Sequence, residues 1–96
     1  MTNTKAIRVP GWKTEITADG ITFERADWFC VANFRDVIKR SAEYEKHGWK
    51  EDNQPYRYGA LGIVGDFVSE GAPIRPWTKT WHAMVEAIAD AAQMNS

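Results

Sequence analysis

The chain has 96 residues, 44% of them hydrophobic and 26% charged, and its 12 basic and 13 acidic side chains leave a formal net charge of −1. This length excludes two independent cores, and this composition excludes global disorder. The near-neutral charge also disfavours a strongly basic surface for non-specific nucleic-acid binding. We therefore expect a single domain over residues 1–96, in which residues 1–4 form a mobile tip.

The sequence carries no sign of export or of a membrane span. Residues 1–10 include no apolar segment of the kind found in signal peptides, and no apolar run approaches the roughly 18 residues that a spanning helix needs. The only cysteine, Cys30, excludes an internal disulfide, and it lies in the apolar run 28–32. We interpret Cys30 as a small buried hydrophobe, and we expect a cytoplasmic protein that makes no membrane contact.

The first regular elements expected are strands. Residues 13–17 and 21–25 mix apolar and polar side chains and are separated by a segment that ends in Asp19-Gly20. An Asp-Gly pair between two such segments predicts a hairpin, because glycine tolerates a positive φ. Residues 28–32 fit two structures, a buried third strand or the start of the next helix, and their β-branched and aromatic content favours the strand slightly.

Apolar side chains recur at helical spacing in two later segments. Residues 34–47 form the first, with Asn33 as the N-cap and Gly48 as the residue that ends the helix. The second segment begins near Pro76 and runs to about Gln93. Both segments are predicted to be amphipathic helices.

Residues 56–68, between the two predicted helices, are apolar and β-prone but contain glycines at positions 59, 62 and 65. We interpret them as one strand or a bent hairpin, in which glycine marks a bulge or a close approach. The glycine spacing matches neither a dinucleotide-binding nor a phosphate-binding loop. The predicted fold is therefore α+β: a mostly antiparallel sheet, made of the N-terminal hairpin and a later strand, with two amphipathic helices packed on one face.

The sequence contains no recognisable catalytic or metal-binding motif. His82, Glu86 and Asp90 lie four residues apart, so they share one face of the last predicted helix, where such groups can hold a divalent metal or serve as acid and base. Because they lie away from the apolar stripe, we interpret them as a solvated face. His47 is interpreted as a partner of the helix dipole. We predict no catalytic residue, no metal site and no cofactor.

The unusual feature of the sequence is its aromatic content, with five Trp, three Tyr and four Phe. The rings predicted to fill the core are Phe23, Phe29, Phe34, Phe67 and Trp81, with Trp28 as a further candidate, whereas Trp12 stands at a turn. Trp, Tyr and Arg are enriched among the residues that dominate binding energy at protein interfaces, and rigid rings give contact area at low entropic cost. The predicted partner-binding surface consists of Trp49, Tyr56, Arg57 and Tyr58, with Trp77 nearby.

These observations favour a non-catalytic module that binds another protein by occupying one of its surfaces, in the size class of the adaptors and inhibitors that phages and mobile elements encode. One alternative is a nucleic-acid-binding accessory protein that stacks bases on the same rings. Another is a small-ligand carrier or enzyme with a cleft beside the last helix, lined by Trp77 and Trp81 with His82 at its mouth. A homodimer is compatible with all three. The phosphate contacts of the nucleic-acid alternative would come from Arg35, Lys39, Arg40, Lys46 and Lys50.

Overall fold

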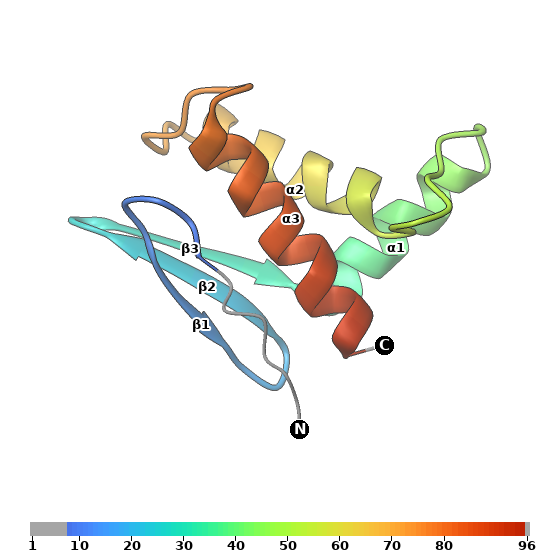
Figure 1. Ribbon diagram of the computed structural model, residues 1–96, viewed down its shortest axis with the longest axis horizontal. Helices are drawn as coiled ribbons and strands as arrows, with labels where there is room; N and C mark the ends of the chain where they lie inside the picture. Colours follow the sequence, from blue (N-terminus) through green and yellow to red (C-terminus); the bar gives the residue numbers. More distant parts are fainter. Residues whose placement is uncertain (1–7, 96) are drawn as a thin grey trace.

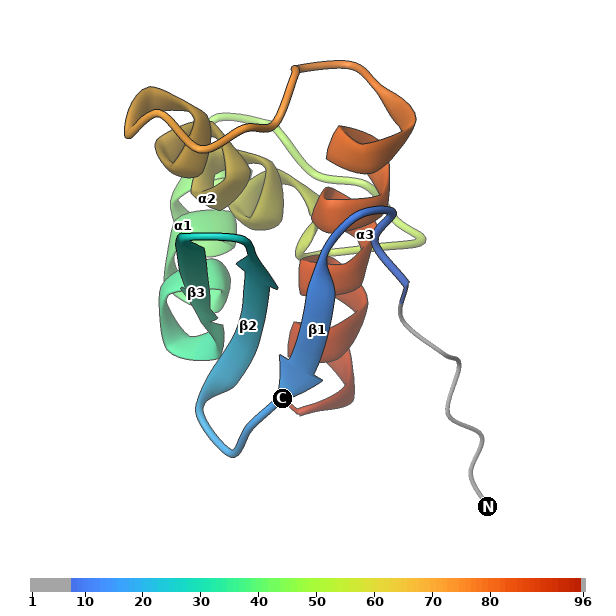
Figure 2. The ribbon, with the colours of Figure 1, turned by 90° about the vertical axis from the view of Figure 1, so that its left-hand side faces the viewer.

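A computed structural model, which describes residues 8–95, contains a three-stranded antiparallel sheet and three helices. The sheet has the order β1-β2-β3, and the helices cover one of its faces (Figure 1, Figure 2). The α+β class is confirmed, and the expectation for residues 1–4 lies outside the described residues. The elements are β1 (Lys13–Ile16), β2 (Gly20–Arg25), β3 (Trp28–Asn33), α1 (Phe34–Glu45), α2 (Arg57–Ser69) and α3 (Lys79–Met94).

The predicted hairpin is present, but its glycine serves a purpose other than the expected one. Ile16 pairs with Ile21, and the turn between β1 and β2 is closed by a 2.8 Å hydrogen bond from the Thr17 amide to the Gly20 carbonyl. Gly20 does not adopt a positive φ. Instead, a Cβ at this position would lie 2.3 Å from the carbonyl oxygen of Ala32 on β3. Glycine is needed here because β3 approaches too closely for any side chain.

Of the two structures that the sequence left open for residues 28–32, the strand is the one that forms. β3 pairs with β2 from Arg25–Trp28 to Gly20–Asn33, so the third strand follows directly from the hairpin. α1 begins at the next residue, because the Asn33 side-chain oxygen accepts hydrogen bonds from two amides of the first helical turn. The strand and the helix therefore share a boundary with no loop between them.

The predicted strand at residues 56–68 is wrong, because this segment is helix α2. The first of its glycines, Gly59, allows α2 to approach α1 closely. A Cβ on Gly59 would lie 2.2 Å from the Val37 carbonyl oxygen, and the Gly59 amide donates to the buried Ser41 hydroxyl over 3.2 Å. Tertiary packing thus overrides the low helix propensity of glycine. The later strand of the predicted sheet is replaced by a third helix.

The core lies between the inner face of the sheet and the helices. Among the fully buried side chains are Ile21 and Phe23 on β2, and Met84 and Ile88 on α3. One expectation about the large rings is wrong. Phe29 is 62% exposed, because strand alternation turns it to the outer face of the sheet while its neighbour Cys30 faces inward.

Trp12 stands at a turn, as the sequence suggested, but its ring is only 7% exposed and belongs to the core. A tight turn, in which the Trp12 amide donates to the Val9 carbonyl over 3.0 Å, folds the chain back before β1. The indole Nε1–H of Trp12 is buried and has no hydrogen-bond partner among residues 8–95. Hydrophobic burial of the ring therefore outweighs the cost of its unpaired donor, about 1–3 kcal/mol.

Both predicted amphipathic helices form, with shifted ends. α1 stops at Glu45, and the chain reverses at Gly48, which has φ of +85°. α3 begins at Lys79, where the Thr78 side chain caps the first turn, rather than at the proline before it. Within residues 8–95, no helix has the length and apolarity required to cross a bilayer.

Candidate protein-binding surfaces

The five indoles divide into buried and exposed groups. Trp12 and Trp81 are 7% and 5% exposed and belong to the core, and Trp28 is half-buried against it. Trp49 and Trp77 are 57% and 72% exposed. The interior therefore does not accommodate all the rings, and two of the five tryptophans present most of their surface to solvent.

The exposed Trp49 and the half-buried Tyr58 form a ring pair, here called the Trp49 pair. Their centroids are 5.7 Å apart in an edge-to-face arrangement. Trp49 follows the reversal after α1, where its amide donates to the Tyr44 carbonyl over 3.0 Å, and Tyr58 lies in the first turn of α2. The pair therefore joins the end of one helix to the start of the next.

The other predicted residues of this loop have structural partners. Tyr56 is half-buried and packs against the core. The Arg57 Nε lies 2.9 Å from a Glu51 carboxylate oxygen, in an ion pair that is not aligned as a hydrogen bond. The loop is tied to α3 by the Gln54 amide, which donates to Asp90 over 2.6 Å. Tyr56 and Arg57 thus position the loop and leave a smaller area for a partner than the Trp49 pair does.

Trp77 belongs to a second group, the Trp77 cluster, which consists of Trp77, Trp81 and His82. Its ring lies 4.6 Å from the Trp81 ring and 6.2 Å from the His82 ring, and Trp81 meets His82 edge-to-face at 4.9 Å. Trp77 has φ of +72°, a left-handed conformation that bulky residues rarely adopt. The next residue fixes this geometry, because the Thr78 hydroxyl donates to the Arg75 carbonyl over 2.7 Å while capping α3.

The structure separates Trp77 from the other four predicted site residues. The Trp49 pair lies where the chain enters α2, and the Trp77 cluster lies beyond its far end (Figure 1). A 13-residue helix is roughly 20 Å long, so one small ligand cannot contact both ring groups. The sequence suggested that Trp77 lies near the other four residues, with residues 56–68 interpreted as one strand or a bent hairpin, whereas the segment is the helix that separates them.

The basic side chains proposed for phosphate contacts lie away from the exposed rings or are paired. Arg40 contacts Asp66 at 2.5 Å, Lys46 contacts Glu43 at 3.5 Å, and Lys50 contacts Glu45 at 3.4 Å. The remaining two, Arg35 and Lys39, lie in the first half of α1, whereas Trp49 follows its end. None of these five side chains therefore offers an unpaired charge beside the Trp49 pair.

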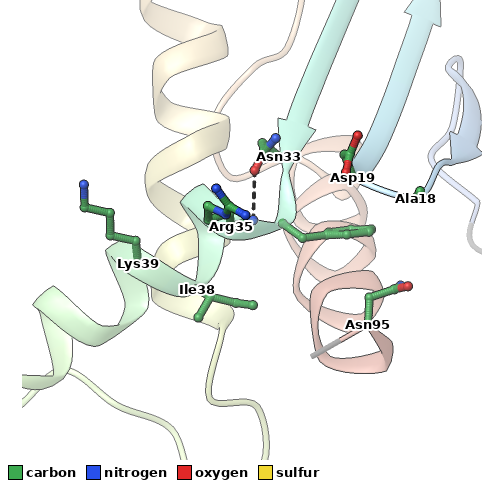
Figure 3. A pocket seen from close by; sticks show the side chains of 8 residues that line it. Ala18, Asp19, Asn33, Arg35, Ile38, Lys39 and Asn95 are labelled. Atoms are coloured by element: carbon green, nitrogen blue, oxygen red, sulfur yellow. Dashed lines mark hydrogen bonds between the residues drawn. The ribbon is translucent and has the colours of Figure 1, made fainter.

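Arg35 and Lys39 instead line a polar hollow of about 600 Å³ at one end of the sheet. Figure 3 shows that its side chains come from the turn before β2, the start of α1 and the end of α3. Asn33 lies at its edge, and its side chain is engaged in capping α1. The hollow contains both carboxylate and basic side chains, so it has no dominant charge: Ala18, Asp19, Asn33, Phe34, Arg35, Ile38, Lys39 and Asn95.

The groups considered for chemistry are dispersed. His82 and Glu86 are exposed, and Asp90 is engaged by Gln54, so the predicted row is a solvated face anchored at one end. Within residues 8–95, no three His, Cys, Asp or Glu side chains gather to hold a metal ion. Burial raises the pKa of the Cys30 thiol, and the Glu70 carboxylate raises it further, so the thiol stays protonated and weakly nucleophilic at neutral pH.

The cleft expected beside the last helix is not lined as the sequence suggested. Trp81 is buried, so its ring is not available as a wall of the cleft, and Trp77 packs over it from outside.

Comparison of the chain with models of protein families, with curated proteins and with solved structures finds no match. The chemistry of the surface is therefore the only basis for a proposed function.

Proposed function

We propose that this protein is a non-catalytic module that binds another protein by occupying one of its surfaces, as an adaptor or inhibitor of the kind that phages encode. The observation that carries the proposal is Trp77, a 72% exposed indole held in a left-handed conformation. Such a conformation costs about 1–2 kcal/mol in a non-glycine residue. An exposed ring recovers little of this cost by burial within its own fold, whereas a partner that covers it supplies the missing contact area.

The Trp77 cluster has the form of an interface anchor. Trp81 is buried and fixes the orientation of the outer ring, and His82 borders it with a group that can donate or accept a hydrogen bond. A pre-oriented ring loses little side-chain entropy when it binds. The Trp49 pair offers a second aromatic contact at the other end of α2. A cytoplasmic location belongs to this proposal, supported by a lone buried thiol.

Near the Trp49 pair, the charges favour a protein partner over nucleic acid. Lys46 and Lys50, the lysines closest in the chain to Trp49, are each paired with a glutamate. A ring pair whose neighbouring lysines are already paired gains little from the release of counterions by a phosphate backbone. If binding to single-stranded nucleic acid were instead observed and fell steeply with added salt, the nucleic-acid alternative would replace this one.

The test is a pair of ring truncations in the full chain. The tagged protein is used to isolate a stoichiometric partner, and the Kd of the reconstituted complex is measured by calorimetry. We expect Trp77→Ala to weaken binding by about 2 kcal/mol or more, roughly thirtyfold, because hot-spot tryptophans contribute on this scale. Trp49→Ala is expected to have a smaller effect, because its ring is less exposed and is not strained.

The control is Met94→Ala, which removes another exposed apolar side chain, 61% exposed, at the end of α3. It should leave the Kd unchanged. A stability measurement separates binding from folding, because Trp77→Gly relieves the left-handed strain and should keep or raise the melting temperature while binding is lost. If Trp77→Ala and Trp49→Ala both retain full partner affinity while the protein melts at a lower temperature, the rings are structural and the proposal fails.

A further inference from the structure

The two edges of the sheet differ in how they resist pairing with another strand. β1, at one edge, is four residues long and carries Lys13 and Glu15. β3, at the other edge, is six residues long and has no charged side chain and no proline. Natural proteins protect exposed edges with charges, prolines or very short strands. By this criterion β1 is protected and β3 is not.

The register of the sheet determines which groups face outward from β3. Arg25 and Trp28 flank a two-residue turn, and such flanking pairs exchange hydrogen bonds, after which bonded and non-bonded pairs alternate. Cys30 therefore bonds to β2, whereas Phe29 and Val31 direct their amides and carbonyls away from the sheet. The 2.9 Å bond from the Phe34 amide to the Asp19 carbonyl agrees with this alternation. Within residues 8–95, no other strand pairs with this edge.

The same two residues carry apolar side chains that face water. Phe29 is 62% exposed and Val31 is 52% exposed, on the outer face of the sheet that no helix covers (Figure 2). A strand added beside β3 would place every second side chain against these two. That half of an incoming strand should therefore be apolar.

The other half of an incoming strand would face a groove of about 240 Å³ between β3 and the first two helices. Its apolar lining includes Cys30, Ile63 and Phe67, and all three are at least nine-tenths buried. Four charged side chains complete the lining: Asp36, Arg40, Asp66 and Glu70.

The rim of this groove is negatively charged. Arg40, its only base, is paired with Asp66, whereas Asp36 and Glu70 have no ion pair with any residue of the described range 8–95. The side chains best suited to this face are lysine and arginine, because their methylene stems cover apolar surface while their charged ends reach carboxylates. The groove thus selects a basic occupant.

We propose that the edge of β3 binds an extended segment of a partner protein that alternates apolar and basic side chains. Backbone hydrogen bonds to Phe29 and Val31 would supply affinity, and the acidic rim would supply selectivity. A second copy of this chain is a poorer occupant, because its own β3 brings no base and its rim would repeat the same negative charge. This surface is distinct from both ring groups, so the inference extends the proposed function without depending on it.

The test is calorimetric titration of the full chain with a capped synthetic peptide that alternates Val and Lys, compared with a peptide that alternates Val and Glu. We expect saturable binding of the basic peptide and at least tenfold weaker binding of the acidic one. Val31→Pro removes an outward amide without breaking the ladder to β2, so it should weaken binding about tenfold. Val31→Thr keeps the amide and the β propensity and is the matched control.

Charge reversal tests the rim separately. The double substitution Asp36→Lys with Glu70→Lys should transfer the preference from the basic to the acidic peptide, and circular dichroism confirms that each variant is folded. Trp77→Ala should bind the basic peptide as the unmodified chain does, so a failure here is distinguishable from a failure of the ring surface.

Three results would overturn the proposal: equal affinity for both peptides, full affinity in Val31→Pro, or no binding of either peptide. Light scattering supplies a further outcome. A dimer that Val31→Pro converts to monomers would show that the edge belongs to a second copy, which also overturns the assignment to a basic segment.

Discussion

At the scale of single residues, two non-glycine residues of the described range 8–95 adopt a positive φ, Ala26 at 51° and Trp77 at 72°. The two differ in what surrounds them. Trp77 stacks on a buried indole and presents a large ring to solvent. Ala26 lies in the two-residue turn between β2 and β3 and carries only a methyl group. Its backbone conformation therefore orients no large side chain. The strained and exposed ring of Trp77 therefore supports the functional proposal, whereas the strain at Ala26 reflects turn geometry alone.

Replacing the turn alanine should therefore stabilise the fold. Ala26→Gly removes the clash between the Cβ and the carbonyl oxygen in the left-handed conformation, and we expect a gain of about 0.5–1 kcal/mol in the free energy of unfolding, measured by urea titration. Ala42→Gly, at an exposed position inside α1, provides the opposite control, because glycine there should cost about 1 kcal/mol. A loss of stability in Ala26→Gly would mean that the Cβ makes an unrecognised favourable contact.

At the scale of elements, α1 and α2 pack closely because small groups line their contact. Gly59 lies against the backbone of α1, whereas Gly65, two turns along the same helix, has open space where a Cβ would stand. The same residue type therefore has opposite roles within one helix.

These roles can be measured by one substitution at each site. Gly59→Ala should destabilise the protein by about 2 kcal/mol or more, because its Cβ would fall 2.2 Å from a backbone oxygen and 2.3 Å from the Ser41 hydroxyl. Gly65→Ala should stabilise it by up to about 1 kcal/mol through helix propensity alone. Thermal unfolding followed by circular dichroism gives both values. Equal effects of the two substitutions would contradict the close packing of α1 on α2.

The elements that the sequence predicted correctly carry their signals locally. α1 has its cap and its apolar stripe, so neighbouring residues suffice, whereas the hairpin was predicted from a glycine that the structure requires for the approach of β3. α2 was wrongly predicted because glycines at 59, 62 and 65 are poor helix formers, and only the close approach of α1 accounts for the first of them. Of the rings predicted for the binding surface, Trp49 and Trp77 are exposed and Tyr56 and Tyr58 are half-buried, and the separation of the two indoles depends on α2 being a helix. The β3 edge and its acidic groove depend on residues from three elements, which no local pattern brings together.

At the scale of the whole molecule, the exposure of each indole can be measured by the quenching of its fluorescence. Trp49 and Trp77 should account for most of the emission that acrylamide quenches, because the other three are buried or half-buried. Each of Trp49→Phe and Trp77→Phe should remove part of the strongly quenched component, and the double variant should remove nearly all of it. Trp12→Phe is the control and should leave that component unchanged. Strong quenching that persists in the double variant would mean that another indole reaches solvent.

The order of the elements has a consequence for how the chain matures. Each strand pairs with its neighbour in sequence and β3 continues into α1, so this part can organise early through contacts that close short loops. The inner face of β2, however, is covered by α3, the last of the six elements in chain order. Until α3 docks, a nascent chain would expose both the apolar inner face of β2 and the unpaired edge of β3. Docking of α3, rather than formation of the hairpins, is therefore the step that removes this apolar face from solvent and lowers the risk of aggregation.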